Sequence, residues 1–166
     1  YRDLTPADEQ VRELLEQRRE GFQSASPDVA AGAKAFETRC GVCHQIEGKG
    51  ARIGPQLDGV GHRGLERLLE DVLDPNRNVD QTFRTTILAL EDGRVLSGLL
   101  LREEGQVVVL ADAQGREVRV ALDEIEDRKV VQLSPMPADL ARQIPETEFY
   151  DLMSYLLNHR DAQPAQ

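Results

Sequence analysis

The stretch Cys40–His44, which reads Cys-Gly-Val-Cys-His, constrains this chain more than any other feature. It holds both cysteines of the sequence, three positions apart, and a histidine follows directly. This spacing is typical of covalent attachment of c-type haem. Each thiol adds to one vinyl group, and His44 then lies under the ring, where an imidazole nitrogen can bind the iron axially. The motif therefore predicts one haem c, attached through Cys40 and Cys43 with His44 as an iron ligand.

Three other interpretations of the two cysteines compete with haem. A thioredoxin-like redox pair is expected early in a βαβ unit, at the start of a helix. Here a helical pattern precedes the motif and a glycine-rich stretch follows it. A structural zinc site needs four ligands, usually in two pairs, and the sequence has no second pair. A disulfide between Cys40 and Cys43 would be strained.

Charge and hydropathy narrow the classes of partner. The net charge is −10, from 20 basic and 30 acidic residues, and binding to phosphate groups needs a basic surface. Nucleic acid and anionic membrane are therefore disfavoured, and a redox partner with a basic docking patch is expected. No apolar run approaches the roughly 20 residues of a membrane span. The chain begins at Tyr1, and we expect a processed protein or one domain of a larger one.

The stretch after the motif, residues 46–57, is too rich in glycine for regular structure and contains the pair Gly54-Pro55. A histidine that binds metal generally has its other ring nitrogen held by an acceptor, often a backbone carbonyl. Proline fixes its own φ angle, so the Pro55 carbonyl is a good candidate for this acceptor. Leu57 is then expected to pack on the haem. The alternative is an ordinary turn without such a role.

Hydrophobic periodicity predicts helices on both sides of a β-rich segment. A first helix is expected from Thr5, its N-cap, to about residue 21. The other helices are expected at about 28–39, 65–73, 139–144 and from 145 to about 159. Between them, short runs rich in β-branched residues alternate with polar turns. These runs predict strands at 85–90, 95–101, 107–110, 118–121 and 129–133, with one helical turn at 122–125.

The iron needs an occupant on the face opposite His44, and Met136 is the best candidate. It lies in a Pro-Met-Pro loop, where two prolines stiffen the backbone that aims the thioether. Met153 lies in the apolar stripe of the last helix and is expected to be core. His62 and His159 are the candidates for a bis-histidine site, and each is more simply explained as a surface histidine.

The Cys40–His44 motif and the residues around it resemble class I cytochromes c. More closely, the order of elements is similar to the haem-binding domain often found at the C-terminal end of large exported proteins in planctomycetes and verrucomicrobia. The residues that carry the resemblance are Gly32, Phe36, Cys40–His44, Gly54-Pro55, Met136-Pro137 and Tyr155-Leu156-Leu157. The resemblance implies a mainly α cytochrome c fold whose first and last helices cross at Gly32. A small antiparallel β-barrel or sheet of about five strands is inserted before the methionine loop, which gives α+β overall.

The resemblance also implies a division of the chain. His44 and Met136 are 92 residues apart, and without residues 84–132 the separation is 43, which suits the ordinary fold. The expected segments are 1–27 (N-terminal helix and linker), 28–83 (haem attachment), 84–132 (inserted β-rich subdomain), 133–160 (methionine loop and last helix) and 161–166 (disordered tail).

The predicted function is electron transfer by a single haem with His44 and Met136 as axial ligands, and no catalytic residue is expected. The alternative is a five-coordinate haem c that senses a small ligand or reduces peroxide at the open iron face. Covalent attachment of haem in bacteria follows export, so a periplasmic or other extracytoplasmic location is expected. The inserted strands are expected either to cover the haem edge or to dock a partner.

Overall fold

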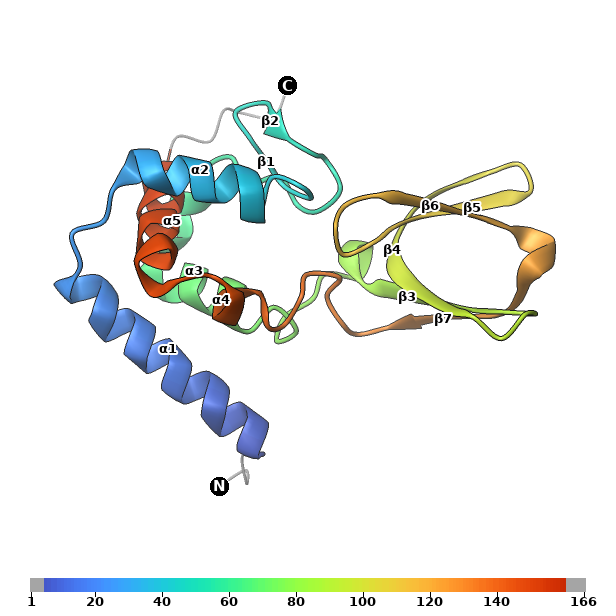
Figure 1. Cartoon of the computed structure of the whole chain (residues 1–166), viewed down its shortest axis with the longest axis horizontal. Coiled ribbons are helices and arrows are strands. Elements are labelled where there is room, and N and C mark those ends of the chain that lie inside the picture. Colours follow the sequence, from blue (N-terminus) through green and yellow to red (C-terminus); the bar gives the residue numbers. More distant parts are fainter. Residues whose placement is uncertain (1–4, 161–166) are drawn as a thin grey trace.

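The computed structural model describes residues 5–160 and shows a helical part joined to a five-stranded sheet (Figure 1). The helices are α1 (Pro6–Ser24), α2 (Val29–Arg39), α3 (Gly64–Leu73), α4 (Leu140–Gln143) and α5 (Glu146–Asn158). The 3-10 turns are η1 (Val60–Arg63), η2 (Gln81–Phe83) and η3 (Leu122–Glu124). The strands are β1 (Gln45–Ile46), β2 (Lys49–Gly50), β3 (Thr85–Leu90), β4 (Val95–Glu104), β5 (Val107–Ala111), β6 (Glu117–Ala121) and β7 (Ile125–Val131). The tail predicted at 161–166 lies outside the described residues.

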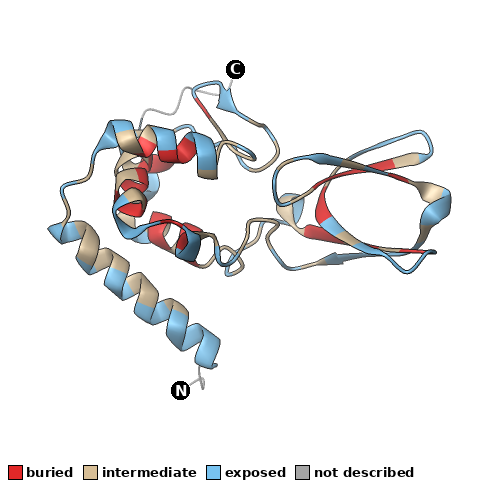
Figure 2. Cartoon of the chain, viewed as in Figure 1, coloured by how far each residue is buried: buried red, intermediate tan, exposed pale blue. Residues whose placement is uncertain are grey.

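Helix α1 begins as the sequence predicts, because Thr5 and Asp8 form a reciprocal cap. The Asp8 N–H donates to Thr5 Oγ1 at 3.2 Å, and the Thr5 N–H donates to Asp8 Oδ2 at 3.0 Å. No residue of α1 is fully buried, and Figure 2 shows the helix exposed along much of its length. Its partly buried Leu14, Leu15 and Phe22 pack against the helical core. Ion pairs add to this packing, of which Arg18–Glu146 at 3.5 Å reaches α5.

Helices α2 and α5 cross closely, as the resemblance implies, and Gly32 permits the crossing. A Cβ atom at Gly32 would lie 2.0 Å from the Asp151 carbonyl oxygen on α5. The faces that meet there form the main hydrophobic core with α3 (Figure 2). Its fully buried side chains include Phe36, Phe149 and Met153. Met153 is therefore core, as expected from its place in the helical stripe.

The five strands β3 to β7 form an antiparallel sheet in the order β6-β5-β4-β3-β7. Leu88, Val108 and Leu110 lie in a second hydrophobic core, separate from the helical one. Five strands confirm the sequence prediction, and the chain is α+β overall. The sheet is not closed into a barrel, because within residues 5–160 its ladder runs from β6 to β7 without pairing these edge strands. Strand β7 carries charged, exposed side chains at 126–129, which are typical of an unpaired edge strand.

Two local predictions are corrected by the structure. The last strand, predicted at 129–133, runs from Ile125 to Val131. The alternating hydrophobic pattern misses its charged beginning because β7 pairs with β3 through its backbone. The stretch after His44 was expected to be irregular, but β1 and β2 form a two-residue antiparallel pair. Glu47 and Gly48 turn the chain between them with φ angles of 50° and 75°.

Within residues 5–160, none of the helices combines the length and the hydropathy that a membrane span requires.

Candidate haem-attachment site

Helix α2 leads directly into the Cys40–His44 stretch. Its N-terminus is capped by Asp28, whose Oδ1 accepts from the Ala30 N–H at 2.9 Å. At its other end, the N–H groups of Cys43 and His44 both donate to the Cys40 carbonyl, at 3.0 and 2.8 Å. The motif is therefore a tight turn that continues the helix. Positions three apart in such a turn lie on one side of it, which suits two thiols that must reach one ring.

The His44 ring is held by the proline carbonyl that the sequence singles out. Its Nδ1 lies 2.8 Å from the Pro55 carbonyl oxygen. A carbonyl oxygen can only accept a hydrogen bond, so Nδ1 carries the proton and Nε2 keeps its lone pair. Burial lowers the pKa of His44, although the hydrogen bond to Pro55 works in the opposite direction. A neutral imidazole with Nε2 available is the form that binds iron.

The loop after β2 wraps around the motif so closely that glycine is required. A Cβ at Gly54 would lie 2.8 Å from His44 Cε1 and 3.1 Å from Nδ1. Backbone hydrogen bonds fix this approach, because the N–H groups of Ile53 and Gly54 donate to the Cys43 carbonyl at 3.1 and 2.7 Å. Gly54 therefore shapes the surroundings of the ring, and Pro55 fixes the ring's direction.

Both cysteines are free thiols with raised pKa values. Burial raises the pKa of Cys40 from 9.0 to about 12, with a smaller effect from Cys43. Burial also raises the pKa of Cys43, with a second contribution from the Asp112 carboxylate. Redox-active Cys-x-x-Cys pairs work through a thiolate of lowered pKa, so these thiols do not resemble them. Within residues 5–160 no group of three or more His, Cys, Asp or Glu side chains is placed to hold a metal ion.

Met136 and Leu57 border the same hydrophobic core as Cys40. All three are partly buried and pack against the cluster formed by α2, α3 and α5. The structure thus brings the predicted haem contacts from three distant parts of the chain to one core. The roles of Cys40, Cys43, His44, Gly54, Pro55, Leu57 and Met136 toward haem stay predictions.

The loop that carries Met136 is held by side chains that the sequence analysis did not identify. The Ser134 N–H donates to Asn76 Oδ1 at 2.8 Å, and the Met136 N–H donates to Ser134 Oγ at 3.1 Å. One residue earlier, the Leu133 carbonyl accepts from both the N–H and the Oγ1 of Thr85, each at 2.9 Å. Asn76 and Ser134 are 58 positions apart, so no local pattern could have paired them.

The two candidate bis-histidine ligands are placed differently from His44. His62 is exposed in η1. His159 Nδ1 lies 3.6 Å from Glu47 Oε1, and its ring packs edge-on against Tyr155 with centroids 4.5 Å apart. The side chain of His159 is only 14% exposed, so it is not the surface histidine expected from the sequence, because its ring packs against Tyr155 beside Glu47.

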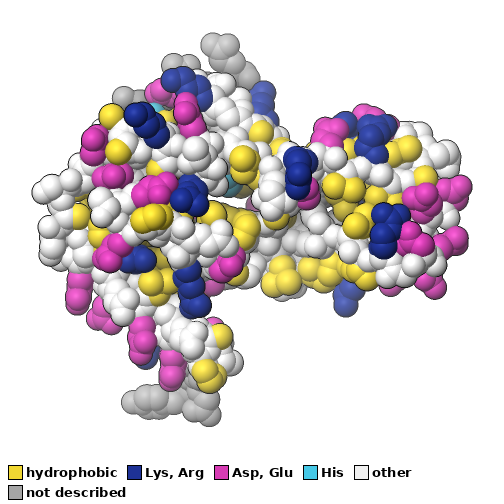
Figure 3. All heavy atoms as spheres, in the orientation of Figure 1, with side chains coloured by type: hydrophobic (Ala, Val, Ile, Leu, Met, Phe, Trp, Pro, Cys, Tyr) yellow, Lys and Arg dark blue, Asp and Glu magenta, His cyan; other side chains and the backbone are white. Residues whose placement is uncertain are grey.

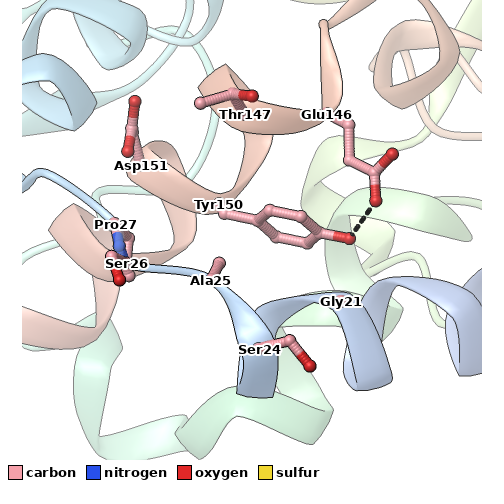
Figure 4. Close-up of a pocket in the computed structure, with 9 residues that line it drawn as sticks. All are labelled: Gly21, Ser24, Ala25, Ser26, Pro27, Glu146, Thr147, Tyr150 and Asp151. Atoms are coloured by element: carbon pink, nitrogen blue, oxygen red, sulfur yellow. Dashed lines mark hydrogen bonds between the residues drawn. The ribbon is translucent and has the colours of Figure 1, made fainter.

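A cavity of about 450 Å³ lies apart from the motif, in the seam between the end of α1 and α5 (Figure 4). Tyr150 points toward Gly21 there, and its hydroxyl donates to Glu146 Oε1 at 2.6 Å. A smaller hollow of about 190 Å³ borders the motif and is lined by Phe36, Glu37, Gly41, Lys49 and Gly50. The chemistry that the sequence predicts is at the motif, and the larger cavity contains none of its residues.

A family model described as Cytochrome c matches residues 29–97. The match begins with α2, includes the motif and α3, and ends in β4. It supports a cytochrome c family for this chain, and with it covalently bound haem c and electron transfer. Cytochrome c domains are generally electron carriers and are typically exported.

The residues present fit the haem that this family implies. Two free thiols sit on one tight turn, and a neutral imidazole has Nδ1 engaged and Nε2 available. The space beside that ring depends on a glycine, because a Cβ at Gly54 would fill it. Met136, outside the matched residues, supplies a thioether sulfur at the edge of the same core.

Proposed function

We propose that this chain is a single-haem c-type electron carrier or electron-transfer domain, in which His44 and Met136 are the axial ligands. The chain carries a β-rich insertion, and in this it resembles the haem-binding domains of planctomycetes and verrucomicrobia. The observation that carries the proposal is the 2.8 Å hydrogen bond between His44 Nδ1 and the Pro55 carbonyl. His44 follows Cys40 by four residues and Cys43 by one. The hydrogen bond fixes the tautomer and direction that an iron ligand needs.

Attached haem would supply a one-electron iron couple. The chain's own residues then hold that group in place: Cys40 and Cys43 through thioether bonds, and His44 through a ring that Pro55 prevents from turning. Met136 contributes a soft sulfur ligand, and His/Met ligation raises the potential relative to two histidines. Leu57 and the helical core limit the access of water, which also tunes the potential. No side chain has to make or break a bond, so the chain needs no catalytic residue.

The proposed division of the chain separates a cytochrome part from an inserted subdomain and an N-terminal segment. Residues 28–83 and 133–160 form the cytochrome part, residues 84–132 form an inserted β-rich subdomain, and 1–27 are an N-terminal helix and linker. Haem attachment implies a periplasmic or other extracytoplasmic location. The net charge of −10 favours a redox partner with a basic docking patch.

Absorption spectra of the haem-loaded protein test the ligation. The oxidised protein should show a sulfur-to-iron band near the red end of the spectrum, and Met136→Ala should abolish it. Met153→Leu is the matched control, since it removes the buried methionine of α5 and conserves volume, and it should keep the band. A high-spin wild-type spectrum that changes with carbon monoxide would instead support a five-coordinate sensor or peroxidase-like site. A band unchanged in Met136→Ala would exclude Met136 as the ligand.

The docking proposal has its own test. The rate of electron exchange with a basic redox partner should fall as ionic strength rises, because salt screens the attraction between exposed charges. Stopped-flow measurements over a range of salt concentrations would show this. A rate independent of ionic strength would refute a charge-guided partner.

A further inference from the structure

The turn between β5 and β6 reaches back to the haem-attachment motif (Figure 1). A Cβ at Gly115, the last residue of the Asp-Ala-Gln-Gly turn, would lie 2.1 Å from the Val42 carbonyl oxygen and 3.5 Å from Ile53 Cδ1. Val42 lies between the two cysteines, and Ile53 directly precedes Gly54. The sheet therefore meets the rest of the chain at the residues that would carry the haem, through backbone contact that leaves no room for a side chain.

The turn is built around the Asp112 side chain. Its Oδ1 accepts from the N–H groups of Gln114 and Arg116, both at 2.9 Å, and its carbonyl accepts from the Gly115 N–H at 3.0 Å. Gly115 has a φ of 74°, which glycine adopts without strain. The carboxylate is thus fixed in the same rigid turn that touches Val42.

This carboxylate lies three residues before Gly115, in the turn whose backbone contacts Val42 between the two cysteines. Its side chain is 25% exposed, whereas that of its basic neighbour Arg116, 3.2 Å away, is 74% exposed. Water screens the exposed guanidinium more than the half-buried carboxylate, so the turn that contacts Val42 keeps a net negative field.

Hydrophobic side chains gather where the sheet meets the helical part, and the molecule narrows there (Figure 3). Val42 itself is 40% exposed. In a chain without residues 112–116, this side of the motif would be open to solvent. The position of the turn favours the covering role over the docking role, since the turn lies against the motif.

We propose that the β5–β6 turn covers the haem-attachment loop and that Asp112 lowers the reduction potential of the attached haem. The proposal rests on the function proposed above. A fixed negative charge stabilises the oxidised iron, which carries one more positive charge than the reduced iron, so it opposes uptake of an electron. Gly115 acts as a positioning residue, because its lack of a side chain lets the turn close on Val42.

Asp112→Asn tests the charge, because an asparagine Oδ1 can still accept the two backbone hydrogen bonds of the turn. The midpoint potential of the haem-loaded protein should rise, with an unchanged sulfur-to-iron band. Asp92→Asn is the matched control. Asp92 accepts from the Arg94 N–H at 3.0 Å in the turn between β3 and β4, at the opposite end of the sheet from the motif (Figure 1). The Asp92→Asn substitution removes the same charge from a turn of the same sheet, and its effect on the midpoint potential should be clearly smaller.

Gly115→Ala tests the cover. Hydrogen exchange of the amides at 41–44 and 51–54 should quicken, because the new Cβ pushes the turn off Val42. Gly105→Ala, in the turn between β4 and β5, is the matched control: its φ is 60° and a Cβ there meets nothing within 4 Å. It strains its turn equally and should leave exchange at the motif unchanged.

The outcomes separate this proposal from the proposed function. Equal potential shifts in Asp112→Asn and Asp92→Asn would overturn the role of Asp112 while leaving a haem protein. Equal exchange rates at the motif in the two glycine variants would overturn the cover. Wild-type protein that attaches no haem would overturn the proposed function, and the potential-tuning role with it.

Discussion

Gly32→Ala should lower the free energy of unfolding by about 3 kcal/mol, because the new methyl group cannot fit between two helices. Its Cβ would lie 2.0 Å from the Asp151 carbonyl oxygen and 2.8 Å from Tyr155 Cβ. A backbone carbonyl cannot turn aside, so α2 and α5 must separate by roughly 1 Å or more to restore ordinary contact. That separation loosens the packing around the buried Phe36 ring. The better helix propensity of alanine, about 1 kcal/mol, offsets only part of this cost.

Gly21→Ala is the matched comparison. Its Cβ would lie 1.7 Å from the Tyr150 hydroxyl oxygen, but the end of a side chain can move into the adjoining cavity. The loss of the hydrogen bond to Glu146 costs about 1 kcal/mol, and alanine's helix propensity recovers a similar amount. Thermal unfolding of the haem-loaded variants gives the answer: Gly32→Ala should melt about 6–12 °C lower than Gly21→Ala. Equal melting temperatures would refute a backbone contact at the α2–α5 crossing.

Two further predictions concern the site. In Gly54→Ala the Cβ would lie 2.8 Å from His44 Cε1, so the ring must turn from Pro55 and the holoprotein should lose its low-spin absorption spectrum. Gly48→Ala, with nothing within 4 Å of its Cβ, should keep it. In the apoprotein, the pKa of Cys40 is raised from 9.0 to about 12, so above pH 9 the unfolded chain releases this proton first. The contribution of Cys40 to stability should be constant below about pH 9 and fall toward pH 12, so in urea titrations a Cys40→Ala variant should lose less stability than the wild type between these pH values.

The core helices α2, α3 and α5 could be predicted from the sequence because each has one face that fits one core. Phe149, Leu152, Met153 and Leu156 recur at helical spacing, and all four are buried in the structure. The α1 N-cap at Thr5 was also visible, since capping uses residues three positions apart. The bond from His44 to the Pro55 carbonyl was predictable for a similar reason: it spans 11 positions within one loop.

The contacts that hold the site from outside that loop could not be predicted. They depend on how the sheet bends, and β4 bends at a register shift between Leu100 and Arg102. Because of this bend, the β5–β6 turn lies beside the motif and the β3–β4 turn lies at the far end (Figure 1). Hydrophobic alternation reports which face of a strand is buried, but it carries no information on where a sheet folds back on itself. The contact between Gly115 and Val42 therefore left no signal in the sequence.

The long connection between α3 and Met136 does not leave the methionine loop loose, because the two ends of the β-rich segment are fastened to each other. Thr85 at its start binds the Leu133 carbonyl at its end through two hydrogen bonds of 2.9 Å, and β3 pairs with β7 immediately beyond. The folding of the sheet thus offsets the entropic cost of closing this long loop. Asn76 then fixes Ser134 from the helical side. Unfolding of the sheet would release Leu133 and the loop after it, so the proposed ligation of iron by Met136 should depend on a sheet that extends beyond the residues matched by the cytochrome c family model.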